Sequence, residues 1–116
     1  MQDFKNLKVW QKAHEFALFT YQITADFPKE ELFGLRNTLR KTSVDIPAFI
    51  AEGCGKTNDQ EFGRLISTAI GLNNRLEYYA LVARDLKLLN DAVHKEYEDG
   101  IVEVRKMLSG FNQRLA

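Results

Sequence analysis

The apolar residues of this chain recur at three- and four-residue steps in four segments, which is the spacing of one helical face. The segments cover about residues 7–26, from 30–35 to 55, about 58–86, and from 90 or 91 to 115. No segment shows the period-two alternation of a half-buried strand. The pattern therefore predicts four helices, with these inward-facing residues: Val9, Trp10, Ala13, Phe16, Ala17, Thr20, Ile23 and Phe27; Leu35, Leu39, Ser43, Ile46 and Ile50; Phe62, Leu65, Ala69, Leu72, Leu76, Tyr79, Ala83 and Leu86; Val93, Tyr97, Ile101, Val104, Leu108, Phe111 and Leu115.

The second predicted helix contains residues that disturb or end a helix. Pro47 lies inside it, and proline removes one backbone donor and clashes with the carbonyl of the residue four positions earlier. We therefore expect the helix to be kinked near Pro47. Gly53 and Gly55 follow, and we expect them to end the helix in the left-handed conformation that glycine commonly takes there.

Helix caps and short connections determine how the four helices are arranged. Asn58, with Glu61 three positions later, resembles a capping box for the third helix, and Asn90 or Asp91 can cap the fourth. Helices joined by short connections run antiparallel to their sequence neighbours. The sequence thus predicts an all-α fold, an antiparallel up-down-up-down four-helix bundle, as a single domain over residues 1–116.

The first predicted helix is apolar on more than one side. Leu18, Phe19 and Tyr21 lie outside its inward-facing positions and widen the apolar face. A helix with two apolar sides is typical of a second contact. We interpret this second side as a contact with another subunit.

The charge balance limits the classes of partner. The chain has 16 Lys and Arg and 16 Asp and Glu, so its formal net charge is zero. Strong non-specific binding of nucleic acid comes from clustered positive charge, so this balance disfavours it for the monomer. A local basic patch, or one built by assembly, is compatible with the composition.

Targeting signals are absent from the pattern. The N-terminal residues are mixed and charged, and no apolar run approaches the 18 residues of a membrane span. Cys54 is the single cysteine, so no disulfide can form within the chain. We expect a cytoplasmic protein without a membrane partner.

Gly55-Lys56-Thr57 resembles the end of a phosphate-binding loop. That motif requires an earlier glycine at position 50, where this chain has Ile50, and it requires a strand before the loop. We therefore interpret the stretch as one helix end followed by the next helix start. The alternative hypothesis is a nucleotide-handling enzyme that uses Lys56 and Glu61.

Other catalytic and metal-binding patterns are incomplete. Asp91 and His94 have the spacing of a di-metal bundle site, but His14 has no acidic residue three positions before it, so we expect surface histidines, no metal and no cofactor. Cys54 has no histidine in its own segment to act as a base, and we expect no catalytic role for it.

Two acidic residues are expected to have structural roles. Glu52 lies near the end of the second helix, where a negative charge opposes the helix dipole, and Glu77 lies beside an inward-facing position. We expect both to form salt bridges at an end of the bundle. Candidate partners for Glu52 are Arg40, Arg64, Arg75 and Arg84.

Two basic segments are candidates for partner contacts. Lys8 and Lys12 share one helical face with Trp10 nearby, and Arg36, Arg40 and Lys41 lie on the second helix. Basic residues beside an aromatic can neutralise and stack on nucleic acid. The alternative reading is that they are the solvated sides of two helices.

Three stretches of the sequence resemble the four-helix bundle family of 23S rRNA intervening-sequence proteins: Val9-Trp10-Gln11-Lys12-Ala13-His14, Phe33-Gly34-Leu35 and Ile50-Ala51-Glu52-Gly53. The resemblance covers nearly the whole chain. It implies an up-down four-helix bundle that assembles as a ring-like homopentamer and has no enzymatic activity. The accessory protein of diversity-generating retroelements is similar, and that protein binds a reverse transcriptase and nucleic acid through a basic surface.

These implications give three hypotheses. The first is a homo-oligomeric adaptor for RNA or a protein partner, with Lys8, Lys12, Arg36, Arg40 and Lys41 as phosphate contacts and Trp10 at a subunit contact or stacked on a base. The second is the nucleotide-handling enzyme. The third is a purely structural module without a ligand.

Overall fold

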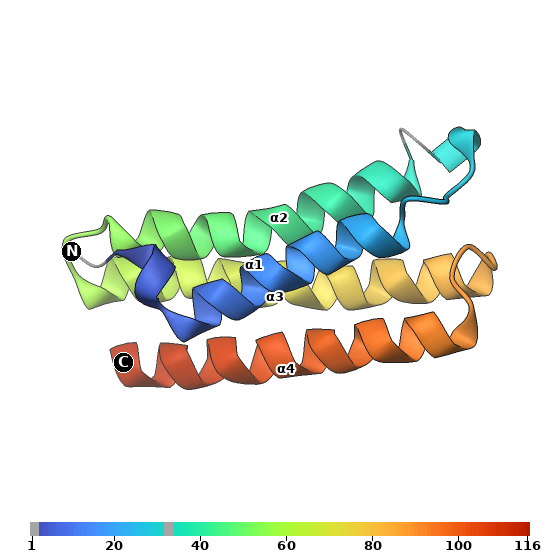
Figure 1. Ribbon diagram of the computed structural model, residues 1–116. Helices are drawn as coiled ribbons and strands as arrows, with labels where there is room; N and C mark the ends of the chain where they lie inside the picture. The colour runs from blue at the N-terminus through green and yellow to red at the C-terminus, as the bar shows by residue number, and fades with distance from the viewer. Residues whose placement is uncertain (1–2, 32–33) are drawn as a thin grey trace.

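The computed structural model describes residues 3–31 and 34–116, and these residues form helices and short connections (Figure 1). Two short 3-10 helices, η1 (Phe4–Asn6) and η2 (Lys29–Glu31), precede the first and second long helices. The long helices are α1 (Lys8–Ile23), α2 (Leu35–Cys54), α3 (Asp59–Asp85) and α4 (Asp91–Leu115). The described part of the chain contains no strand, which confirms the predicted all-α class.

The four long helices form an antiparallel bundle that measures 43 × 23 × 20 Å (Figure 1). Among the described residues, α1 and α3 each pack against α2 and α4. No close backbone contacts join α1 to α3 or α2 to α4 within this part of the chain, so these pairs are diagonal. The predicted four-helix bundle is therefore confirmed. Pro47 is buried inside α2, and the kink expected there stays a prediction.

Asparagine side chains cap the starts of α3 and α4, which confirms Asn58 and selects Asn90 over the alternative Asp91. Oδ1 of Asn58 accepts the backbone N–H of Glu61 at 2.8 Å, and Oδ1 of Asn90 accepts that of Val93 at 2.8 Å. The reciprocal half of a capping box is replaced, because the Glu61 carboxylate accepts from Arg64 at 2.9 Å. Each cap satisfies a backbone donor that the helix itself leaves unpaired.

The predicted left-handed helix end at Gly53 and Gly55 is wrong. Gly53 lies within α2, and Gly55 has a φ of −87°, which any residue can adopt. Gly53 is needed for a different reason, because a Cβ atom there would lie 2.5 Å from the ring of Phe62. Within residues 3–31 and 34–116, the left-handed residue is Lys87, with a φ of 64°, after the end of α3.

Lys87 completes a Schellman motif at the end of α3. The backbone N–H of Leu88 donates to Ala83 at 2.8 Å, and that of Lys87 donates to Arg84 at 2.9 Å. These two bonds satisfy carbonyl groups that the helix end leaves unpaired. Lysine thus occupies a position where glycine is usual.

The core contains most of the predicted inward-facing residues, with one clear exception. Leu86 was expected to be buried, but it is one of the most exposed large apolar side chains among the described residues. The Schellman motif explains this difference, because the chain leaves the helical path at that point. Asn73 was not predicted inside, yet it is fully buried and donates from Nδ2 to the carbonyl of Ile101 at 3.0 Å.

Candidate functional site

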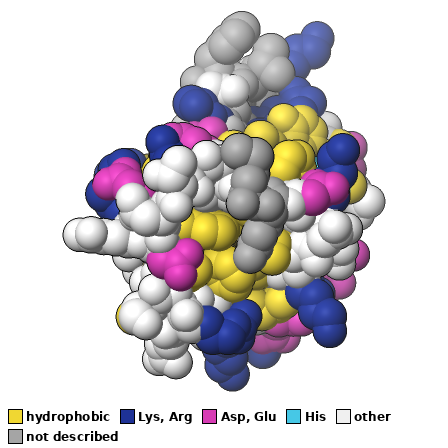
Figure 2. All heavy atoms as spheres, turned by 90° about the vertical axis from the view of Figure 1, so that its left-hand side faces the viewer, with side chains coloured by type: hydrophobic (Ala, Val, Ile, Leu, Met, Phe, Trp, Pro, Cys, Tyr) yellow, Lys and Arg dark blue, Asp and Glu magenta, His cyan; other side chains and the backbone are white. Residues whose placement is uncertain are grey.

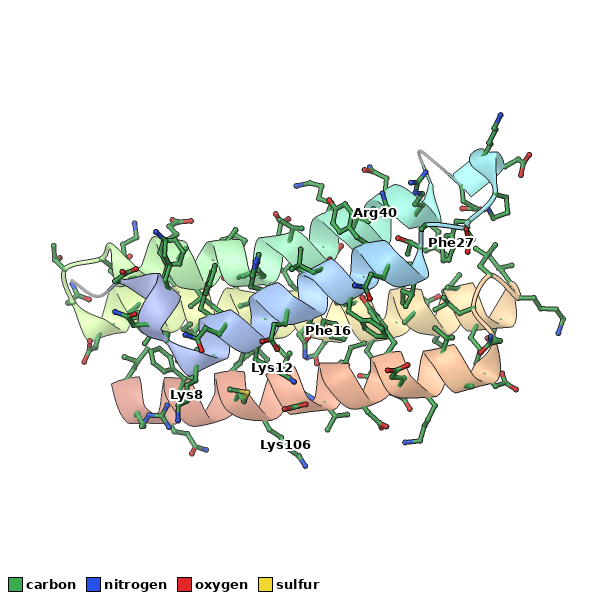
Figure 3. The ribbon with its side chains drawn as sticks, in the orientation of Figure 1. Lys8, Lys12, Phe16, Phe27, Arg40 and Lys106 are labelled. Carbon is green, nitrogen blue, oxygen red and sulfur yellow. The ribbon has the colours of Figure 1, made fainter. Side chains whose placement is uncertain are left out.

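The structure separates the basic residues that the sequence grouped as candidate contacts. Arg36, Arg40 and Lys41 line an open groove of about 580 Å³ between α1 and α2, which we call the α1–α2 groove; its other lining residues are Tyr21, Asn37, Val44 and Asp45. Lys8 lies in a different groove, between α1 and α4. Figure 3 shows Arg40 and Lys8 toward opposite ends of the bundle. The six predicted contacts therefore do not form one site.

The guanidinium of Arg40 is hydrogen-bonded within its own chain. Its Nε donates to Oγ1 of Thr24 at 2.8 Å, and its terminal nitrogen donates to the carbonyl of Tyr21 at 3.2 Å. The guanidinium also lies 4.4 Å from the centre of the Tyr21 ring. Burial, followed by the nearby charge of Arg36, lowers the pKa of Arg40. Arg40 therefore fastens α2 to the carbonyl end of α1.

Arg36 and Lys41 differ in whether their side-chain nitrogens have partners in the chain. Lys41 forms an exposed ion pair with Asp45 on the same helix at 3.3 Å, and such pairs contribute little to stability. The buried Nε of Arg36 has no hydrogen-bond partner among residues 3–31 and 34–116. The α1–α2 groove thus contains three cations, of which two have defined partners in their own chain.

Trp10 and Lys12 both contact their own bundle. The Trp10 indole stacks on the exposed His14 with ring centres 4.9 Å apart and packs edge-on against Phe4, also at 4.9 Å. Lys12 forms an ion pair with Glu103 of α4 at 3.3 Å. Four acidic residues line the groove around Lys12, which opposes contact with phosphate there: Glu15, Glu96, Asp99 and Glu103.

Lys8 shares its groove with two basic residues that sequence reasoning did not select. Lys106 and Arg114 of α4 line the same groove, of about 360 Å³, which we call the α1–α4 groove; its other lining residues are Asn6, Leu7, Val9, Met107, Gly110 and Phe111. Figure 3 shows Lys8 and Lys106 on α1 and α4, in the half of the bundle that holds the termini. Lys106 and Arg114 are eight positions apart, a spacing that repeats on one side of a helix and was the available signal.

The acidic residues Glu52 and Glu77 form ion pairs, although not all with the expected partners. Glu52 pairs with Lys56 at 3.8 Å, and none of the four proposed arginines is its ion-pair partner. Glu77 of α3 accepts from Arg105 of α4 at 3.0 Å, and Arg105 also donates to Asn74 at 3.0 Å. The Glu77 contact joins two helices.

The Gly55-Lys56-Thr57 stretch does not have the geometry of a phosphate-binding loop. It connects α2 to α3, whereas the motif requires a strand before the loop. Lys56 is paired with Glu52, and the Glu61 carboxylate accepts from Arg64, so both proposed groups have partners in the chain. The structure does not favour the nucleotide-handling hypothesis.

The cysteine and the two histidines do not have the arrangement of a catalytic pair. Cys54 is buried, and burial raises the pKa of its thiol, which makes it a poor nucleophile. His14 is exposed as expected, but the expectation of a surface position is wrong for His94, which is buried. Within the described ranges, no three His, Cys, Asp or Glu side chains gather as metal ligands would.

The end of the bundle that holds both termini is mixed in charge. Figure 2 shows hydrophobic side chains in the middle of this end, with Lys, Arg, Asp and Glu side chains around the edge. No helix in residues 3–31 and 34–116 combines the length and apolarity needed to cross a bilayer.

Comparison with known proteins identifies the family. The chain has no match among curated proteins. The model of the 23S rRNA-intervening sequence protein family matches residues 5–110. Two of the three stretches that suggested this family lie in α1 and α2, and Phe33 of the third lies outside the described residues. With nearly the whole chain matched, the protein belongs to the family of 23S rRNA-intervening sequence proteins.

Proposed function

We propose that this chain is a non-enzymatic adaptor that assembles as a ring-like homo-oligomer, a pentamer by its family resemblance, and that presents a binding surface to RNA. The observation that carries the assembly is a pair of exposed apolar faces. Leu18, Tyr21 and Val44 form the first face, on adjacent α1 and α2, and they are 52%, 43% and 41% exposed. Tyr78 and Leu81 form the second face, on α3, at 62% and 36%.

The two faces point in different directions. α1 and α3 are diagonal in the bundle, so their outer sides lie on opposite sides of the molecule. Gly71 lies seven positions before Tyr78 on α3, and a Cβ atom there would meet nothing within 4 Å, so this side of α3 is open to a neighbouring backbone. Two unlike faces on one chain fit a head-to-tail contact, and such contacts form a ring when the rotation closes.

Assembly also answers the problem of zero net charge. A monomer with 16 acidic and 16 basic residues has no overall attraction for RNA. A ring places several copies of any local basic groove on one particle, and linked binding sites raise the effective concentration of the second contact. Weak sites on one chain thereby become a strong surface on the assembly.

The first test is the mass in solution, by size-exclusion chromatography with light scattering. Wild type should have about five times the 13.4 kDa mass of one chain. Leu18→Glu and Tyr78→Glu should each abolish the ring, because a charge in an apolar contact is strongly unfavourable. Leu86→Glu is the matched control, since Leu86 is 60% exposed but lies on neither face, and it should keep the wild-type mass.

Mixing the two variants tests the head-to-tail geometry. The Leu18→Glu chain keeps an intact α3 face, and the Tyr78→Glu chain keeps an intact α1 and α2 face. Their mixture should therefore form a heterodimer through the one contact that both faces still allow. A Tyr78→Glu chain that still assembles would contradict the head-to-tail arrangement. A monomeric wild type would remove the assembly and favour a structural module without self-association.

A further inference from the structure

We propose that the α1–α4 groove is a phosphate-binding site for single-stranded RNA, in which Lys8, Lys106 and Arg114 contact the backbone. This inference rests on the proposed function and deepens it, because it names the surface that the adaptor presents and the chemical group that it binds. Two of the three residues lie near the end of the chain, and the site exists only because folding brings α4 beside the start of α1.

Within the described part of the chain, no acidic side chain lines this groove. Among the described residues, Lys8, Lys106 and Arg114 have no ion-pair partner, whereas Lys12, Lys41 and Lys95 each pair with a carboxylate. In a chain of zero net charge, three cations around one hollow are a local excess. An anion bound there replaces no existing ion pair, so binding does not require one to break.

The position of Arg114 suits contact with a phosphate group. Its guanidinium lies 5.6 Å from the centre of the Phe111 ring, which supports the planar group against an aromatic face. A guanidinium held in this way presents several donors that match the oxygens of a phosphate. The two lysines add charges that follow a flexible backbone.

The apolar part of the groove indicates that bases are not read. Phe111 is buried and packs edge-on against Phe62 at 5.2 Å, so its ring is unavailable for stacking on a base. Leu7 and Met107 are the other large apolar lining residues, and both are half-buried. Contacts to phosphate carry no sequence information, so binding here should tolerate any RNA sequence.

The experiment is a fluorescence anisotropy titration with a mixed-sequence single-stranded RNA over a range of salt concentrations. The double variant Lys8→Gln/Lys106→Gln removes two cations from the groove. The control Lys29→Gln/Lys87→Gln removes two exposed lysines from the opposite end of the bundle, where η2 and the connection between α3 and α4 lie (Figure 1). The two variants have the same net charge.

The groove variant should lose affinity on the order of tenfold or more at low salt, and its salt slope should fall by about 0.7 for each phosphate that it no longer neutralises. The control should stay within about twofold of wild type and keep the wild-type slope. Light scattering should give both variants the wild-type mass, which separates a failure of the groove from a failure of the proposed assembly.

Three results would overturn the proposal. One is wild-type protein that binds no RNA at low salt. Another is an equal loss of affinity in both variants, which would show attraction by overall charge alone. The third is a groove variant that keeps the wild-type affinity and salt slope. A loss of affinity confined to the groove variant, with a reduced salt slope, supports the groove as the RNA site.

Discussion

Two polar side chains in the core illustrate how single residues define this bundle. The Thr20 hydroxyl of α1 donates to the carbonyl of Phe16 at 3.0 Å and lies 2.7 Å from the Tyr97 hydroxyl of α4. A hydroxyl has one proton, so Tyr97 must be the donor to Thr20 when both bonds form. Both residues are fully buried, and burial raises the pKa of Tyr97. The pair joins α1 to α4, beside the Phe16 ring, which stacks on Tyr97 with ring centres 4.5 Å apart.

Replacement of Tyr97 by phenylalanine should produce a pH-dependent difference in stability. At neutral pH we expect Tyr97→Phe to lower the free energy of unfolding by about 1 kcal/mol, because it removes one buried hydrogen bond. Above the ordinary tyrosine pKa of 10.0, the unfolded chain ionises while the folded phenol stays neutral. Wild type should then lose up to about 1.4 kcal/mol per pH unit from this residue. The stability that Tyr97 contributes is thus present below pH 10.0 and lost as pH rises above it.

Urea unfolding of wild type and Tyr97→Phe between neutral and alkaline pH measures this difference. The difference in free energy of unfolding between wild type and Tyr97→Phe should narrow above the ordinary tyrosine pKa. A constant gap for Tyr97→Phe would contradict a buried, neutral phenol.

At the scale of elements, the starts of the helices could be located from sequence better than their ends. The asparagine caps of α3 and α4 each bond a backbone N–H three positions away, and sequence alone located Asn58 and narrowed the other cap to Asn90 or Asp91. Residue type did not locate the left-handed helix end, because glycine is the usual residue there. Among the described residues, the left-handed conformation occurs at Lys87 and not at Gly55.

Glycine should stabilise the protein at position 87, where the chain has lysine, and it should not be required at position 55, where the chain has glycine. Lys87→Gly should raise the free energy of unfolding by roughly 1 kcal/mol, because glycine carries no steric penalty in the left-handed region. Gly55→Ala should leave it unchanged or raise it by up to about 1 kcal/mol, because alanine fits a φ of −87° and restricts the unfolded chain. Denaturant titration of both variants measures this. A decrease of about 1 kcal/mol in Gly55→Ala would restore the left-handed helix end expected there.

At the scale of the whole molecule, the outer surface carries the information about partners. One exposed apolar face lies on α1 and α2 and the other on α3, and the basic grooves lie on two sides of α1. The α1–α2 groove includes Tyr21 and Val44 of the first apolar face, so assembly would cover part of it. The α1–α4 groove shares no residue with either face.

If the ring forms, thermal stability should depend on protein concentration. Association that requires the folded chain stabilises it by mass action, so Tm should rise with concentration for wild type. Leu18→Glu should remove this dependence, and Leu86→Glu should retain it. Differential scanning fluorimetry over a hundredfold range of concentration measures the effect. A wild-type Tm that stays constant would argue against assembly.

The sequence by itself determined the helices, their caps and the bundle, because these depend on apolar spacing and on contacts within a few residues. It also selected Lys8, but it grouped Lys8 with Lys12 and Trp10 because they share a helical face. Spacing along one helix does not reveal which charges a neighbouring helix neutralises, and Glu103 of α4 neutralises Lys12.

Only the tertiary structure decided which basic residues have no partner in their own chain. Arg40 of α2 forms hydrogen bonds with the end of α1. Lys106 and Arg114 line the same groove as Lys8, although they are about 100 positions away in sequence. The burial of His94 and Asn73 and the exposure of Leu86 were decided at the same level. The physical reason is that the charge balance and burial of a surface residue depend on elements packed beside it, which a pattern along one helix does not contain.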